Sequence, residues 1–97
     1  MYVILTSKPG EFTTELGDGL TAVETYDYIF YGRKKAEYVI AELTGDTRVR
    51  IVDAADPSIV NSVPSKFLEK FDTLDGARAE LGALTRFGNI DAQLVSR

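Results

Sequence analysis

Histidine, cysteine and tryptophan are absent from this 97-residue sequence. Because there is no cysteine, the chain alone cannot supply disulfides, thiolate catalysis, zinc ribbons or iron–sulfur ligands. Because there is no histidine, it lacks the commonest general base and the commonest transition-metal ligand. We therefore expect no catalytic residue, no metal site and no cofactor, and enzymatic activity is the less favoured class of function.

Long apolar runs are also missing. The N-terminal residues 1–10 contain an apolar run of only four residues and no basic segment before it, unlike a secretory signal. Nowhere does a run approach the roughly 20 apolar residues that a membrane span needs. These features predict a protein without a membrane segment and a cytoplasmic location.

The composition is that of an ordinary globular protein. Hydrophobic residues make up 44% and charged residues 27% of the chain. Its length predicts one domain covering residues 1–97. The formal net charge of −4, from 11 basic and 15 acidic side chains, argues mildly against a broad nucleic-acid surface.

Residues 22–53 contain four of the five tyrosines and the main cluster of positive charge, and they predict a β-meander. Tyr26, Tyr28 and Phe30 share one face of its first strand, which we expect to face the core. Residues 36–43 fit either a strand or an amphipathic helix, and we favour the strand. A helix there would place basic residues at its N-terminus, against the helix dipole. Residues 47–53 alternate as a half-exposed strand.

The flanking segments predict two more strands and one clear helix. Residues 2–6 and 59–63 are the expected strands, whereas residues 11–21 are expected to form a surface loop. The Gly17-Asp18-Gly19 sequence in that loop lacks the spacing of a phosphate-binding loop.

Residues 65–71 predict a brief helical turn whose Phe67, Leu68 and Phe71 form an apolar cluster. Residues 73–86 predict a helix capped by Asp72, with Gly88 just past its end and a frayed tail from Asn89. Its apolar stripe comprises Leu74, Ala77, Leu81 and Leu84. The whole pattern predicts an α+β fold, with an antiparallel meander of about four or five strands and this C-terminal helix packed on one face.

The most distinctive candidate site is the tip of the hairpin at residues 28–38. Its aromatic side chains lie in sequence beside Arg33, Lys34 and Lys35, as in proteins that stack bases and neutralise phosphates of single-stranded nucleic acid. A solvated turn with core aromatics behind it explains the same pattern, and we favour that interpretation.

A second candidate is acidic. Asp46, Asp53 and Asp56 could meet at one end of the meander and bind a hard cation, but the spacing of an EF-hand is absent. Solvated turns are the favoured interpretation here too.

We predict a non-catalytic protein–protein interaction module, such as a small accessory or regulatory subunit or an inhibitor. Its partner is expected to be another protein, and an incompletely covered sheet also predicts a homodimer. The alternatives are a single-stranded nucleic-acid binder and a cofactor-free enzyme or active-site-contributing subunit. The expected binding residues combine arginine, lysine and tyrosine, which suit interface anchors: Tyr31, Arg33, Lys34, Lys35, Tyr38, Arg48 and Arg50.

Overall fold

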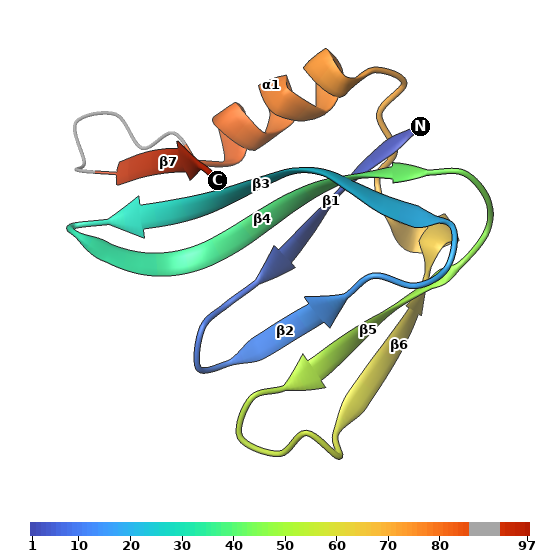
Figure 1. The fold of residues 1–97 in the computed structure, drawn as a ribbon, viewed down its shortest axis with the longest axis horizontal. Helices are drawn as coiled ribbons and strands as arrows, with labels where there is room; N and C mark the ends of the chain where they lie inside the picture. Colours follow the sequence, from blue (N-terminus) through green and yellow to red (C-terminus); the bar gives the residue numbers. More distant parts are fainter. Residues whose placement is uncertain (86–91) are drawn as a thin grey trace.

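The computed structural model describes residues 1–85 and 92–97, and its elements form an α+β fold as predicted (Figure 1). In these residues the strands are β1 (Tyr2–Ser7), β2 (Phe12–Glu15), β3 (Leu20–Phe30), β4 (Arg33–Leu43), β5 (Arg48–Asp53), β6 (Val60–Pro64) and β7 (Ala92–Ser96). A short 3₁₀ turn, η1 (Ser65–Phe67), and one helix, α1 (Leu74–Leu84), complete them. The strands form two antiparallel sheets, rather than the one expected, in the orders β1-β4-β3-β7 and β2-β5-β6.

The β3–β4 hairpin is the longest pairing in the four-stranded sheet. Residues 36–43 are part of β4, which confirms the strand interpretation over the helix. Tyr31 and Gly32 have φ angles of 49° and 76°, so both central turn residues are left-handed, as a tight two-residue hairpin requires. The turn is therefore shorter than the predicted 32–35 connection, and Arg33 already belongs to β4.

The predicted loop at residues 11–21 is corrected in part, because β2 lies within it. β2 is only four residues long, and its pairing with β5, from Phe12 opposite Asp53 to Glu15 opposite Arg50, holds it extended. This long-range pairing is invisible to local periodicity. β6, pairing with β5 on its other side, completes the second sheet.

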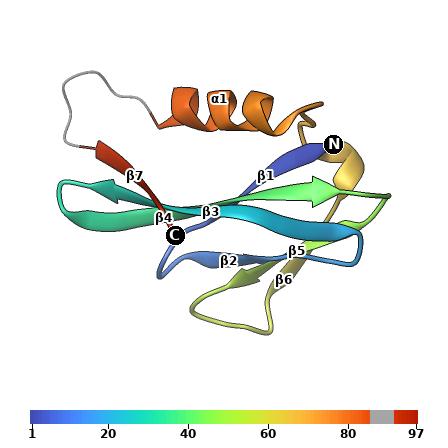
Figure 2. The same cartoon turned by 45° about the horizontal axis from the view of Figure 1, so that its top comes forward.

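The two faces of the four-stranded sheet bury separate cores. In Figure 2, α1 lies over one face and the three-stranded sheet lies below the other. Val3, Leu5 and Ala41 point to the core shared with Val49 of the second sheet. Ile40, one residue away from Ala41, instead packs against Ala77 and Leu81 of α1, as strand alternation requires.

The helix begins at Leu74, one residue later than predicted, and its cap is one residue later as well. Thr73, not Asp72, is the N-cap, since its Oγ1 accepts a hydrogen bond from the Gly76 N–H at 3.0 Å. Tyr26 and Tyr28 lie on the face toward the core as expected: Tyr28 is buried, and Tyr26 packs against the helix-side core. The predicted helix end at Arg86 and Gly88 lies outside the described residues.

The segment after β6 is shorter and less buried than predicted. η1 spans only three residues, and Phe67 is 70% exposed, with the Lys66 ammonium 5.2 Å from its ring centre. Leu68 and Phe71 do pack inward, against different cores. The buried Ser65 explains the turn, because its Oγ accepts a hydrogen bond from the Thr47 N–H at 3.0 Å.

The C-terminal residues 92–96 are not a frayed tail but strand β7, which pairs with β3 from Tyr26 to Phe30. The rest of the predicted tail, residues 89–91, lies outside the described residues. Within the described ranges no helix has the length and apolarity to cross a membrane.

Candidate functional site

The β3–β4 hairpin tip presents only part of the predicted basic surface. Tyr31 is 62% exposed and meets the Phe30 ring edge-on, with ring centres 4.7 Å apart. Arg33 and Lys35 are exposed, and neither forms an ion pair with a described residue. Lys34, by contrast, is held by two carboxylates, 3.0 Å from Asp27 and 3.3 Å from Glu37.

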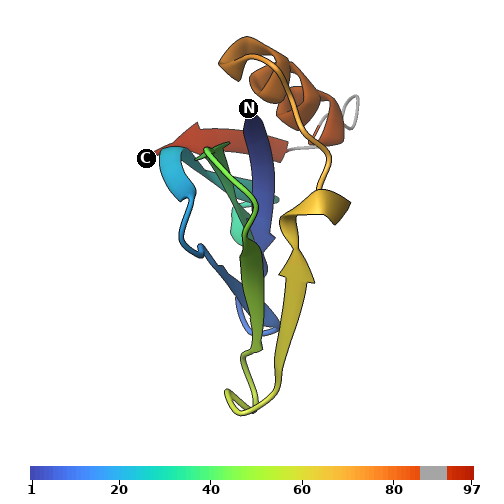
Figure 3. The ribbon, with the colours of Figure 1, turned by 90° about the vertical axis from the view of Figure 1, so that its right-hand side faces the viewer.

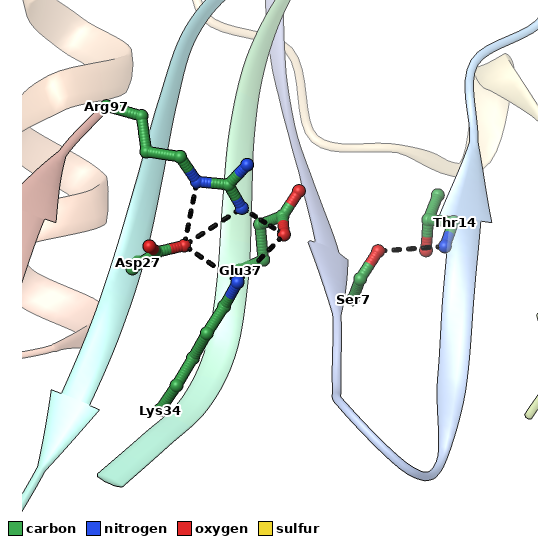
Figure 4. Close-up of polar contacts among 6 residues, drawn as sticks. All are labelled: Ser7, Thr14, Asp27, Lys34, Glu37 and Arg97. Atoms are coloured by element: carbon green, nitrogen blue, oxygen red, sulfur yellow. Dashed lines mark hydrogen bonds and ion pairs between the residues drawn. The ribbon is translucent and has the colours of Figure 1, made fainter.

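Lys34 belongs to a four-residue ion cluster that joins β3 and β4 to Arg97, the residue after β7 (Figure 4). Arg97 lies opposite it and bonds through Nε to Asp27 at 2.9 Å and through Nη2 to Glu37. Hydrogen bonds from Lys34 and Arg97 lower the pKa of Asp27, and the carboxylates raise the pKa values of both cations. Two positive and two negative groups cancel, so this cluster contributes to sheet cohesion rather than to a basic surface.

Tyr38 lies in the core on the helix side, away from solvent for much of its ring. It meets Tyr28 at 6.3 Å between ring centres with an angle of 62°. Burial raises its pKa, with a smaller effect of Tyr28. Its position is that of a packing residue.

Arg48 and Arg50 are exposed on β5, in the other sheet from the hairpin tip. Arg48 donates from Nε to Ser62 Oγ at 2.7 Å and lines a hollow of about 380 Å³ with Asp46 and Lys66. Arg50 lies 3.5 Å from Glu15 on β2. The seven expected binding residues are thus divided among the tip, the core and β5, and they do not form one patch.

Asp53 and Asp56, at the end of β5 and just after it, stabilise the turn between β5 and β6. Asp53 Oδ1 accepts hydrogen bonds from the N–H groups of Ala55 and Asp56, and Asp56 Oδ1 accepts two from Ser58. The Ser58 hydroxyl and amide lower the pKa of Asp56. Among the described residues, no group of three or more acidic side chains is placed to hold a metal ion.

A feature that sequence reasoning missed is an apolar groove that crosses the free edge of β1. It consists of three hollows of about 160, 240 and 450 Å³ that share lining residues. Ile4 and Thr6 line both the first and the second, and Phe12 and Ile51 line both the second and the third. The groove therefore continues from α1, across the edge of β1, to the far end of β2 and β5.

The groove is lined mainly by hydrophobic side chains from both sheets, the segment after η1 and the helix. Figure 3 shows β1 and β6, two of these strands, viewed from the side. The hydrophobic lining residues are Ile4, Leu5, Phe12, Val49, Ile51, Ala55, Ile59, Val63, Leu68, Phe71 and Leu84. Ile59 and Leu84 remain 52% and 51% exposed, one at each end.

The signal for this groove was present in the sequence but ambiguous. Leu84 continues the apolar stripe of the helix by one turn, although only Ala77 and Leu81 are buried. Ile59 lies beside a turn, where an apolar residue without a local partner is unexpected. Comparison with protein-family models, curated proteins and solved structures finds no match to this chain.

Proposed function

We propose that this chain is a non-catalytic protein-binding module, such as a small accessory or regulatory subunit or an inhibitor, which binds its partner along the apolar groove. The continuity of the groove is the observation that supports this function best. Contiguous exposed apolar surface is uncommon on isolated proteins and is typical of interaction sites. A groove that extends over three hollows and crosses a strand edge suits a polypeptide better than a compact metabolite. A cytoplasmic location remains part of this proposal.

Site-directed photo-crosslinking tests the proposed function. A photoreactive phenylalanine analogue would replace Ile59 or Leu84 in the groove, or the similarly exposed Val23 or Val95 outside it as controls. In nuclease-treated native lysate, we expect one discrete protein adduct at both groove positions and none at the controls. Equal adducts at all four positions, or no adduct at the groove, would reject the groove as the binding surface.

A second copy of this chain would be a special case of the same function. Light scattering of the purified chain distinguishes it, because a dimer that Ile59→Ser dissociates and Val23→Ser leaves intact would identify the partner as another copy.

Single-stranded nucleic-acid binding is the second candidate function, and the hairpin tip supports it. Tyr31, Arg33 and Lys35 lie together there, exposed and without ion pairs to described residues. This function predicts steeply salt-dependent binding of an oligonucleotide, lost in Arg33→Ala/Lys35→Ala. Unchanged binding in that variant would reject it.

A further inference from the structure

The carboxylates along the apolar groove carry uncompensated negative charge. Glu69 and Glu80 line its helix end, and Glu11 and Asp53 line its other end. No lysine or arginine lines any of the three hollows in the described part of the chain. None of these four carboxylates forms an ion pair with a described cation.

The middle of the groove exposes an unpaired strand edge. The Met1 carbonyl accepts from the Leu43 N–H at 2.7 Å, so Val3 and Leu5 are the residues that bond to β4. The alternate residues therefore turn their N–H and C=O groups outward. Tyr2 uses its outward groups to pair with Phe71, at 2.8 Å in both directions.

Ile4 is the next outward-facing residue, and no described residue bonds to its N–H or C=O. At Thr6 the carbonyl accepts from the Thr14 hydroxyl, and the N–H bonds to no described residue. Phe71 covers the start of the β1 edge and Thr14 covers its end. The stretch of edge between these two contacts offers the N–H groups of Ile4 and Thr6 and the carbonyl of Ile4, in the same hollows that present apolar side chains. Open strand edges of this kind pair readily with an extended chain.

We propose that the groove binds an extended segment of another protein in which a short apolar stretch is flanked by basic residues. This rests on the proposed function and specifies the chemistry of the partner. The segment bonds to the main chain of Ile4, and its apolar side chains enter the hollows lined by Phe12, Ile51 and Phe71. Its lysines or arginines meet the carboxylates at the two ends. Basic residues on either side of an apolar stretch place the charges at the two ends of the groove and the apolar side chains between them.

Titration of the full ¹⁵N-labelled chain with synthetic peptides tests the proposal. One peptide of about ten residues has a valine stretch flanked by lysines at both ends, and its control carries glutamates in place of the lysines. We expect the lysine peptide to bind at least about tenfold more tightly at low salt, and added salt to weaken it. The amide signals of Ile4, Thr6 and Ile51 should shift, and hydrogen exchange at Ile4 should slow.

Charge-neutral variants locate the basic contacts. Glu69→Gln/Glu80→Gln should weaken the lysine peptide several-fold, while Glu42→Gln, an exposed carboxylate outside the groove, should leave its affinity unchanged. Equal affinity for both peptides, or shifts confined to the hairpin tip, would overturn the proposal. If either result is found but the photo-crosslinks are still specific to the groove, the protein-binding function stands and the partner has a different chemistry. If the groove-specific photo-crosslinks are absent as well, both the protein-binding function and this proposal are rejected.

Discussion

Arg78 of α1 donates from Nε to Glu24 Oε1 on β3 at 2.9 Å, and this contact ties the helix to the sheet over a sequence separation of 54 residues. The same guanidinium reaches Asp75 of its own helix at 3.0 Å. Tyr26 adds a hydrogen bond from its hydroxyl to Glu24 Oε1 at 2.7 Å. Helix and sheet are therefore joined by a polar contact beside the buried contacts of Ile40 and Leu81.

This contact predicts an acid-dependent loss of stability that Glu24→Gln removes. Hydrogen bonds from Arg78 and then Tyr26 hold the pKa of Glu24 at about 2, against an ordinary value of 4.5. Since the folded pKa is the lower one, the stabilisation is complete above about pH 4.5 and is lost as pH falls toward 2. Urea denaturation measures the free energy of unfolding of the unmodified chain and of Glu24→Gln. The difference between the two should shrink as pH falls through this window. The effect is modest because the Arg78 side chain is 45% exposed to solvent, which screens the ion pair.

Glu42→Gln is the matched control, since Glu42 is exposed and forms no ion pair with a described residue. As pH falls from about 4.5 toward 2, the excess loss of stability in Glu24→Gln over Glu42→Gln should disappear. A Glu24→Gln difference that is constant over the same range would contradict the assigned role of Arg78.

Two leucines on one helix should differ sharply in their contribution to stability. Leu81 is buried against Ile40 and Ala77, so Leu81→Ala leaves a cavity and should cost about 2–5 kcal/mol of unfolding free energy. Leu84→Ala, three residues later but half exposed, should cost less than about 1 kcal/mol. Chemical denaturation measures both, and comparable losses would show that Leu84 is part of the core rather than of the groove.

Substitution of two glycines distinguishes a position where another backbone approaches closely from a position that only lies in a turn. A Cβ at Gly17 would lie 2.3 Å from the Arg48 carbonyl oxygen, so Gly17→Ala should push β5 away and cost about 1–3 kcal/mol. Gly45 has nothing within 4 Å of its Cβ position and no positive φ. Gly45→Ala should therefore be neutral or slightly stabilising. Thermal unfolding of the two variants decides this, and a harmless Gly17→Ala would mean that β5 tolerates the displacement.

Local sequence patterns were sufficient to predict most strands and the helix, but not the long-range pairing of strands into two sheets. β3, β4, β5 and α1 follow from β-forming content, alternation and the spacing of Leu74, Ala77 and Leu81. β2 and β7 were missed because each is short and is held by pairing with a distant strand. The division into two sheets depends on where β4 ends and β5 begins a new pairing, which no residue type specifies.

The candidate site was harder still to predict. Charge and aromatic content drew attention to residues 31–38, yet Asp27 and Glu37 neutralise Lys34, and Tyr38 packs inward. The groove instead combines ordinary residues such as Ile4, Phe12 and Ile59. Their exposure depends on how two sheets and a helix meet, so the local pattern at Leu84 and Ile59 could not define the groove.

Arg97 should control how firmly β7 stays on the sheet. It is the residue after β7, and its guanidinium bonds to Asp27 on β3 and Glu37 on β4. Arg97→Met keeps its backbone hydrogen bond to Thr25 but removes these ion pairs. Amide exchange of residues 92–96 should then become roughly two- to fivefold faster, the range of a partly exposed ion pair. Lys34→Met is the control, because it removes a charge from the same cluster while leaving Arg97 bound. If Lys34→Met loosens β7 as much as Arg97→Met does, the strand depends on the charge balance of the cluster and not on the arginine bridge.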